Sequence, residues 1–180
     1  VPVGKVKSVM AYRAVPASRD TMRPGMSGMR GGGSREEVAR RAPLRGNLAA
    51  LDLGTNNCRL LIARPEGERF VIVDAFSRIV RLGEGLAATG RLSDAAIERT
   101  ISALSVCAEK LRRRRVVLAR SVATEACRQA ANGAEFVARV QAETGIMLDI
   151  ISAREEARLA VLGCQSLLED GEGRAMIFDI

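Results

Sequence analysis

The sequence predicts a mixed α/β domain built on a sheet, preceded by a basic tail. Two observations carry this prediction. Short apolar segments of strand type and segments with helical apolar spacing follow one another after residue 46, in the order βββαβααβαβ. Turn-forming residues and helix caps separate these segments. The apolar content of 47% in 180 residues is enough for a sizeable core.

Residues 1–46 differ in composition from the rest. They hold 10 Lys+Arg against 3 Asp+Glu, whereas residues 47–180 hold 18 of each. Four of the five prolines lie there and no apolar period is present, so the segment cannot offset its ordering entropy and is predicted to be disordered. One interpretation is an arm attracted to nucleic acid, polyphosphate or anionic lipid. The other, which we prefer, is a solvating extension or the product of an upstream start site.

The predicted domain begins with a meander of about three strands. Leu48–Leu53 and Cys58–Ala63 flank Gly54–Asn57, a connection rich in turn formers, which predicts a β-hairpin. A polar turn and two further strand candidates follow, at Pro65–Gly67, Phe70–Val73 and Phe76–Leu82. Glycines at 83, 85 and 90 then mark a loop.

Ser93 is predicted to cap a long helix. Its apolar residues recur every three or four positions, at Ile97, Ile101, Leu104, Ala108 and Leu111. The helix ends in Arg112–Arg115, which we interpret as a solvated terminus whose cations complement the helix dipole; the alternative is an anion-binding role.

The second half alternates strands and helices. Val116–Val122 is predicted as a buried strand, followed by a short helix from Thr124. Asn132–Glu135 has the residue types that open a helix, here expected to reach about residue 142, and Ile146–Ile151 is the next strand.

Ser152–Glu155 is a capping box for the last helix. The buried face of that helix is predicted to consist of Ala157, Ala160, Val161, Cys164 and Leu168. Ala175–Ile180 is the final strand candidate.

Several classes of function are disfavoured by composition. The chain has no histidine, which removes Ser-His-Asp and Cys-His catalysis and the usual zinc ligand. One Tyr, four Phe and no Trp offer few aromatic side chains on which bases could stack, which disfavours nucleic acid as a ligand. The four cysteines fit neither a zinc pattern nor a disulfide framework and are expected to be reduced core thiols. Without an apolar segment of about 20 residues or a signal sequence, we expect a soluble, cytoplasmic protein.

Two strand candidates end on an aspartate, Asp52 and Asp179, an arrangement that can present a carboxylate to a metal-bound phosphate. After Asp52, Gly54 allows the backbone to approach a ligand, and Thr55 and Asn56 offer side-chain hydrogen bonds. Asp52 would face a magnesium ion, through water. An ordinary hairpin turn uses the same residue types, and this segment alone does not decide between the two readings.

Two helical residues are further candidates. Glu155 is expected to reach back to the Ser152 N–H, whereas Glu156 lies about 100° further round and could activate a water for attack on phosphorus. Arg128, in a short helix after a buried strand, could fork onto phosphate oxygens. A surface charge for Glu156 and a surface salt bridge for Arg128 are the alternatives.

Four segments together resemble the exopolyphosphatase and guanosine pentaphosphate phosphohydrolase (Ppx/GppA) family. In order and spacing, they are Ala49-Ala-Leu-Asp-Leu-Gly-Thr-Asn-Asn57, Ala123-Thr-Glu-Ala-Cys-Arg128, Ile150-Ile-Ser-Ala-Arg-Glu-Glu-Ala-Arg158 and Ile177-Phe-Asp-Ile180. The resemblance covers about residues 47–180. It departs from the family pattern at Ala153, where a glycine is usual, and in lacking the phosphate loop and second domain that follow the equivalent of Ile180.

The resemblance implies an actin-like fold of the sugar-kinase, Hsp70 and actin type, in which two related α/β domains close on a phosphate-bearing ligand and Mg²⁺. This chain would be the first domain, truncated at the first strand of the second. Asp52 and Asp179 would be the paired metal-facing acids, Thr55, Asn56 and Arg128 would touch phosphate, and Glu156 would be the catalytic base.

The function implied is a phosphoanhydride hydrolase that removes terminal phosphate from polyphosphate or guanosine pentaphosphate. Lacking its C-terminal domain, the chain alone is expected to be nearly inactive. The rivals are an ATP-dependent kinase or ATPase of the same superfamily and a module that binds guanosine alarmones without hydrolysis. The sequence does not separate the two substrates, and it leaves the oligomeric state open, with a homodimer as one alternative.

Overall fold

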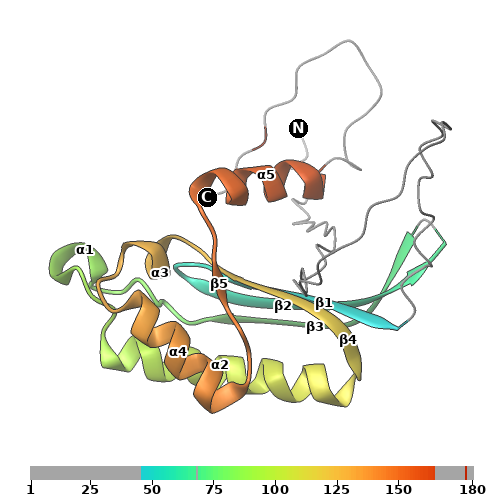
Figure 1. Ribbon diagram of the computed structural model, residues 1–180, viewed down its shortest axis with the longest axis horizontal. Helices are drawn as coiled ribbons and strands as arrows, with labels where there is room; N and C mark the ends of the chain where they lie inside the picture. Colours follow the sequence, from blue (N-terminus) through green and yellow to red (C-terminus); the bar gives the residue numbers. More distant parts are fainter. Residues whose placement is uncertain (1–45, 68, 165–176, 178–180) are drawn as a thin grey trace, which may run out of the picture. The chain divides into compact units, whose positions relative to one another are not determined.

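A computed structural model describes residues 46–67, 69–164 and 177, and these contain one five-stranded mixed sheet of order β3-β2-β1-β4-β5 (Figure 1). Its first three strands form an antiparallel meander, and its last two run parallel to the first. The strands are β1 Asn47–Leu53, β2 Asn57–Glu66, β3 Arg69–Ile79, β4 Val116–Ala123 and β5 Asp149–Ile150. The predicted mixed sheet is confirmed.

β3 is one continuous strand where the sequence suggested two. Ile62 of β2 pairs with Asp74 and the next residue pairs with Ile72, so Val73 is an extra residue in a β-bulge that joins the two predicted segments. The strand also ends earlier than predicted. Val80 and Leu82 follow it as buried residues outside the sheet, because their apolar side chains enter the core without pairing.

Helices cover one face of the sheet (Figure 1). The long helix α2, Asp94–Arg113, begins as predicted at Ser93, whose Oγ accepts a hydrogen bond from the Ala96 N–H at 3.3 Å. Its predicted stripe is confirmed: four members are buried and Leu111 is half-buried. The segment predicted as a loop contains a single-turn helix, α1, Leu86–Thr89.

The basic end of α2 is joined to the meander through Asp74 of β3. Lys110 donates to this carboxylate at 2.8 Å and Arg114 donates to it at 2.9 Å. These two hydrogen bonds lower the pKa of Asp74 to about 2. Arg112, Arg113 and Arg115 of the same run are exposed.

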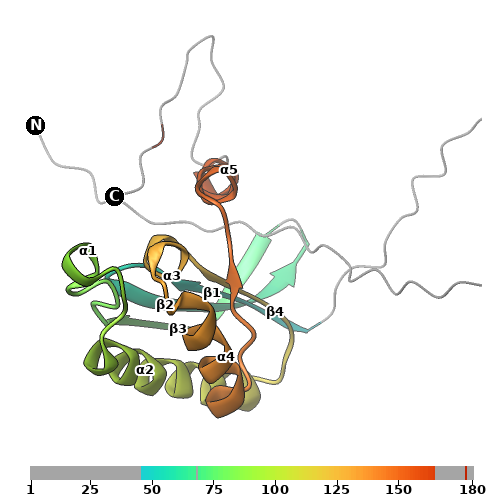
Figure 2. The same ribbon diagram turned by 60° about the vertical axis from the view of Figure 1, so that its left-hand side comes forward.

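Strand alternation assigns the residues of β1 to two faces. Leu51 and Leu53 are buried against the helices, together with Cys58, which pairs with Leu53 in β2. Asp52 lies between the two leucines and therefore belongs to the opposite face. Figures 1 and 2 show α5, Ala153–Cys164, on that opposite side of the sheet from α2 and α4.

The helix α4, Gly133–Thr144, opens where the residue types of Asn132–Glu135 predicted it, after the turn that follows α3, Glu125–Gln129. Asn132 is the N-cap of α4 but makes no side-chain bond to that helix. Its side chain instead accepts from the Leu92 N–H at 2.9 Å and donates to the Leu92 carbonyl at 3.0 Å. The buried amide therefore satisfies both backbone groups of Leu92 in the loop before α2.

Two predictions for the last third are wrong. Only Asp149–Ile150 of the predicted strand 146–151 pairs with β4; Ile146 and Leu148 are buried in a loop. The predicted apolar face of α5 is not buried either. Among its described residues only Gly163 is buried, and the Val161 side chain is 51% exposed, since no described element packs along this stripe. Leu168, the strand 175–180 and the tail 1–45 lie outside the described residues, except for Ile177.

All four cysteines are free thiols. Cys58 and Cys107 are buried with their sulfurs 4.0 Å apart, and Cys127 is also buried. Cys164 is only half-buried, so the prediction of a core position is wrong for it. Within the described ranges, no helix combines the length and apolarity that crossing a membrane requires.

Candidate functional site

The candidate site begins where β1 ends. Asp52 is half-buried and lies opposite Arg59 of β2 and Val122 of β4. Its neighbours Leu51 and Leu53 are fully buried on the helix side, and their burial fixes the strand register. The carboxylate is thereby directed to the face that α2 and α4 leave uncovered.

The loop after β1 presents its carbonyls to the segment after β3. Gly54 donates to the Asn57 carbonyl at 2.9 Å and closes the predicted hairpin. The Asn56 carbonyl accepts from two consecutive backbone N–H groups, at 2.8 and 3.1 Å, and the Thr55 carbonyl accepts from a third at 3.0 Å. Thr55 is half-buried and Asn56 is exposed. These three backbone hydrogen bonds hold the loop against the segment after β3.

The start of α3 adjoins the same end of β1. Thr124, the residue before α3, donates its N–H to the Leu53 carbonyl at 3.1 Å. This backbone bond places the first turn of α3 next to the end of β1. Sequence reasoning did not single out Thr124, although it lies inside the Ala123–Arg128 motif.

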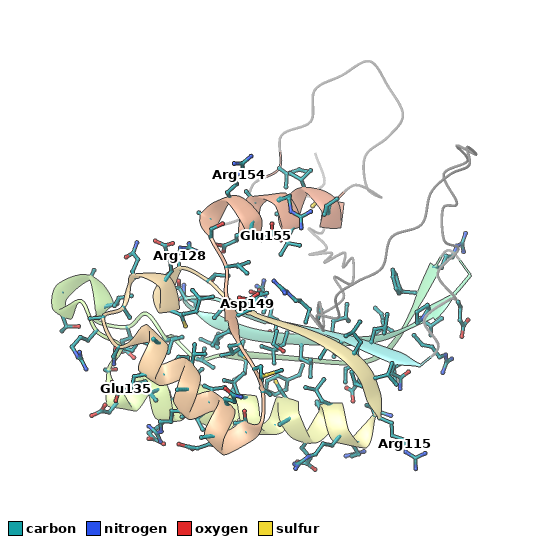
Figure 3. The ribbon with its side chains drawn as sticks, in the orientation of Figure 1. Arg115, Arg128, Glu135, Asp149, Arg154 and Glu155 are labelled. Atoms are coloured by element: carbon teal, nitrogen blue, oxygen red, sulfur yellow. The ribbon has the colours of Figure 1, made fainter. Side chains whose placement is uncertain are left out.

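Arg128 extends from α3 to the start of α5, as Figure 3 shows. Its Nη1 donates to the Ile151 carbonyl at 2.5 Å, and its Nη2 is paired with the carboxylates of Glu125 and Glu156, the latter at 3.3 Å. Partial burial works against the charged guanidinium, but the hydrogen bonds to Glu125 and Glu156 outweigh it and raise the pKa of Arg128. Arg128 is therefore a fixed cation at the junction of two helices.

The two adjacent glutamates of α5 separate as predicted. Glu156 contacts Arg128, whereas Glu155 forms a two-point ion pair with Arg158 at 2.7 and 2.8 Å. The hydrogen bonds from Arg158 lower the pKa of Glu155. Half of the predicted capping box is present, since the Ser152 Oγ accepts from the Glu155 N–H at 3.2 Å. The predicted reach of the Glu155 carboxylate back to Ser152 is wrong, because Arg158 is the stronger partner.

The structure thus brings Arg128 and Glu156 into contact. Asp52 and the Gly54–Asn56 loop lie at the end of β1, the strand next to β4, which leads into the helix of Arg128. Asp179 lies outside the described residues. Glu125 was not predicted, although it lies in the same motif as Arg128 and its i, i+3 spacing is the available signal.

The predicted magnesium site at Asp52 can be assessed from the ligand atoms that the described residues offer. Within residues 46–67 and 69–164, no cluster of three or more acidic, cysteine or histidine side chains is present. Magnesium requires few protein carboxylates and keeps several waters, and the side-chain oxygens of Asp52, Thr55 and Asn56 are the hard ligands that it accepts. Of the two predicted metal-facing acids, the described residues include Asp52, and its carboxylate is of the ligand type that magnesium prefers.

The basic run at the end of α2 is distant from this site. Figure 3 shows Arg115 at the opposite end of the sheet from Arg128. The pairing of β1 agrees, since Asn47 at its start pairs with Val116 and Leu53 at its end pairs with Ala123. Arg112–Arg115 therefore contributes nothing to the site around Asp52.

Comparison with known proteins decides the family. Residues 61–180 match the model of the Ppx/GppA phosphatase family. The chain belongs to this family. Arg128, Glu156 and Asp179 lie within the matched residues, and Asp52 precedes them.

Solved structures of Ppx/GppA proteins support the assignment. The PPX-GPPA enzyme of Aquifex aeolicus is 35% identical over 68% of this chain, with a TM-score of 0.65. An exopolyphosphatase-like protein is 33% identical over 69%, also with a TM-score of 0.65. An exopolyphosphatase from Cytophaga hutchinsonii is 27% identical over 67%, with a TM-score of 0.64. The predicted actin-like fold is thereby confirmed for the first domain.

The chain spans only part of these Ppx/GppA relatives. It covers 41% of the Aquifex chain and 38% of the Cytophaga chain. The segment that corresponds to the rest of a Ppx/GppA protein is not among the 180 residues.

Proposed function

We propose that this chain is the phosphate-binding first domain of a phosphoanhydride hydrolase that releases terminal phosphate from inorganic polyphosphate or guanosine pentaphosphate. Family membership supports a phosphatase, and a structural relative is described as an exopolyphosphatase. The observation that carries the proposal is the contact between Arg128 and Glu156 beside the end of β1. This contact brings together a guanidinium that can bind phosphate oxygens and a carboxylate that can act as a base.

The proposed chemistry is in-line attack of water on the terminal phosphorus. Arg128 binds two phosphate oxygens through its planar fork, and the Gly54–Asn56 loop binds the remaining oxygens through small polar groups. Glu156 accepts a proton from the attacking water as its oxygen bonds to phosphorus. The bond from phosphorus to the bridging oxygen breaks, and the shortened anion leaves with the electron pair.

Because Arg128 contacts Glu156, a bound phosphate would have to replace the Glu156 carboxylate as the partner of the guanidinium. The Glu156 carboxylate accepts hydrogen bonds from the Arg128 guanidinium. When phosphate takes that place, the Glu156 carboxylate is released from the guanidinium and can accept a proton from the attacking water. Substrate binding would therefore make the base available.

Asp52 and Asp179 are the residues we propose to hold magnesium. Such an ion would neutralise charge that develops on the phosphate oxygens. Asp52 would hold this ion from its half-buried position at a strand end, with an oxygen ligand of the type that magnesium prefers.

We further propose that the chain as printed binds phosphate chains but hydrolyses them slowly or not at all. The chain covers only 41% of the Aquifex relative and 38% of the Cytophaga relative, so much of a Ppx/GppA protein would contribute groups that this chain does not supply. Transition-state stabilisation depends on groups that surround the phosphate from all sides. The first domain alone is therefore expected to bind a phosphate chain without hydrolysing it at an appreciable rate.

The test measures phosphate release from polyphosphate and guanosine pentaphosphate. It compares the chain alone with the chain joined after residue 180 to the C-terminal part of the Aquifex relative. Glu156→Gln is expected to lower kcat of the joined protein by about 10²–10⁴-fold, the usual contribution of a general base. Glu155→Gln is the matched control, because this neighbour is paired with Arg158.

Unchanged turnover in Glu156→Gln would remove Glu156 from the mechanism. Tight binding of guanosine pentaphosphate without phosphate release in the joined protein would instead indicate a non-hydrolytic module. Magnesium-dependent ATP turnover would indicate a kinase or ATPase.

A further inference from the structure

Arg99, on the first half of α2, contacts the segment that follows β3. Its Nε donates to the Val80 carbonyl at 3.1 Å. Its Nη2 donates to the Arg81 carbonyl at 3.4 Å and is paired with the Glu84 carboxylate at 2.5 Å. One guanidinium therefore serves three acceptors on five consecutive residues.

The same segment holds the loop after β1. The N–H groups of Val80 and Arg81 both donate to the Asn56 carbonyl, at 2.8 and 3.1 Å, and the Gly83 N–H donates to the Thr55 carbonyl at 3.0 Å. The two residues whose carbonyls bind Arg99 are thus the two whose N–H groups bind Asn56. A continuous path of hydrogen bonds runs from α2 to the loop.

Backbone geometry shows that this segment depends on external support. Arg81 has φ 48°, a left-handed conformation that is unfavourable for a residue with a side chain. Gly83 approaches Thr55 so closely that a Cβ at position 83 would lie 2.4 Å from the Thr55 Cγ2. The turn therefore needs tertiary contacts to persist, and it sets the position of the Thr55 side chain directly.

The chemistry of the contact favours arginine over lysine. The planar guanidinium reaches two carbonyls and a carboxylate in fixed directions, whereas an ammonium is a point charge on a flexible stem. The Arg99 side chain is 43% exposed and borders a shallow open pocket with Ile79, Arg81 and Glu84. At such exposure its stabilising effect is small, and its main consequence is orientation.

We propose that Arg99 is a positioning residue that fixes Thr55 and Asn56 for phosphate binding by holding the Val80–Glu84 segment. The inference rests on the proposed function, in that the loop after β1 must bind phosphate. Arg99 touches no ligand in this account. It acts through the backbone bonds to Thr55 and Asn56.

The experiment uses the chain as printed, with inorganic tripolyphosphate as the probe. Amide hydrogen exchange is measured at residues 80, 81 and 83, and the Kd for tripolyphosphate is measured by calorimetry. Arg99→Ala is expected to accelerate exchange at these three amides by about tenfold while core amides of β1 and α2 keep their protection. The Kd is expected to weaken by about tenfold, because a displaced binding group loses much of its contact energy.

Three variants sharpen the result. Arg99→Lys is expected to lie between wild type and Arg99→Ala. Glu84→Gln keeps the contacts of Arg99 with the Val80 and Arg81 carbonyls, so it should change amide exchange and the Kd in the same direction but by less. It replaces Arg99→Ala as the test variant if Arg99→Ala does not fold. Arg139→Ala is the matched control: this arginine is similarly exposed, its ion pairs within the described residues are with the side chains of Glu98 and Glu143, and its loss should change neither readout.

The proposal is overturned if exchange accelerates uniformly through the chain, which would show a general stabilising role, or if the three amides are unaffected. It is also overturned if local exchange accelerates while the Kd stays the same. If wild type itself fails to bind tripolyphosphate, the proposed function fails at this loop, and the exchange data still decide whether Arg99 holds the segment.

Discussion

Replacing Glu156 by glutamine is expected to tighten anion binding by this chain, although it removes the proposed base. In the free chain the Glu156 carboxylate lies 3.3 and 3.4 Å from the two terminal nitrogens of Arg128. A phosphate must displace it from the guanidinium. The amide of glutamine competes more weakly and does not repel the incoming anion.

The magnitude follows from the geometry and exposure of the pair. Both distances exceed the roughly 2.7–2.9 Å of a strong charge-assisted bond. The two side chains are 25% and 31% exposed. Displacing this contact should therefore cost about 0.5 kcal/mol, within the range of partly exposed pairs. Repulsion between the carboxylate and a phosphate charge about 5 Å away adds about 0.8 kcal/mol in water. The total of about 1.3 kcal/mol corresponds to a Kd lower by about tenfold.

Calorimetric titration of the chain with tripolyphosphate measures this effect. Glu155→Gln is the control and should leave the Kd unchanged, since its carboxylate is paired with Arg158. The gain in Glu156→Gln should shrink at high salt, because exposed charges are screened. Equal or weaker binding by Glu156→Gln at low salt would refute the idea that Glu156 and phosphate compete for Arg128.

Three further predictions concern the fold. Asn132→Ala should lower the free energy of unfolding in urea by about 2–4 kcal/mol, because it leaves two buried backbone groups of Leu92 without partners; a loss below about 0.5 kcal/mol would contradict this. The pKa of Asp74 is lowered to about 2, so its contribution to stability is present above the ordinary value of about 4 and is lost as pH falls toward 2. The stability difference between wild type and Asp74→Asn should accordingly shrink over that window, and a constant difference would argue against the ion pairs. Burial raises the pKa of Cys127 to about 12, so a thiol reagent should modify half-buried Cys164 first, and rapid labelling of Cys127 in the folded chain would contradict its burial.

Local signals in the sequence predicted most of the fold. The turn residues of Gly54–Asn57 and the cap at Ser93 act within a few residues, and both were predicted correctly. Predictions that depend on a distant partner were less successful. The Asn132 side chain binds Leu92, 40 positions earlier, instead of its own helix, and the apolar stripe of α5 lacks a described partner.

The candidate site shows the same division. Asp52 and the loop after it could be proposed from one segment, because a strand end and a turn are local features. The contact between Arg128 and Glu156 joins residues 28 positions apart, and the parallel pairing of β4 with β5 brings together the helices that follow these two strands. Arg99 gave no signal in the sequence, since an exposed helical arginine is typical of any solvated face.

A single phosphate site at the end of β1 can be tested by a tripolyphosphate titration of the chain followed by NMR. The amides of Gly54–Asn56 and the side-chain Nε–H of Arg128 are expected to shift together and saturate with one Kd, while Arg112–Arg115 at the far end of the sheet do not respond. Separate saturation of the loop and Arg128, or shifts confined to Arg112–Arg115, would contradict a single phosphate site at the end of β1.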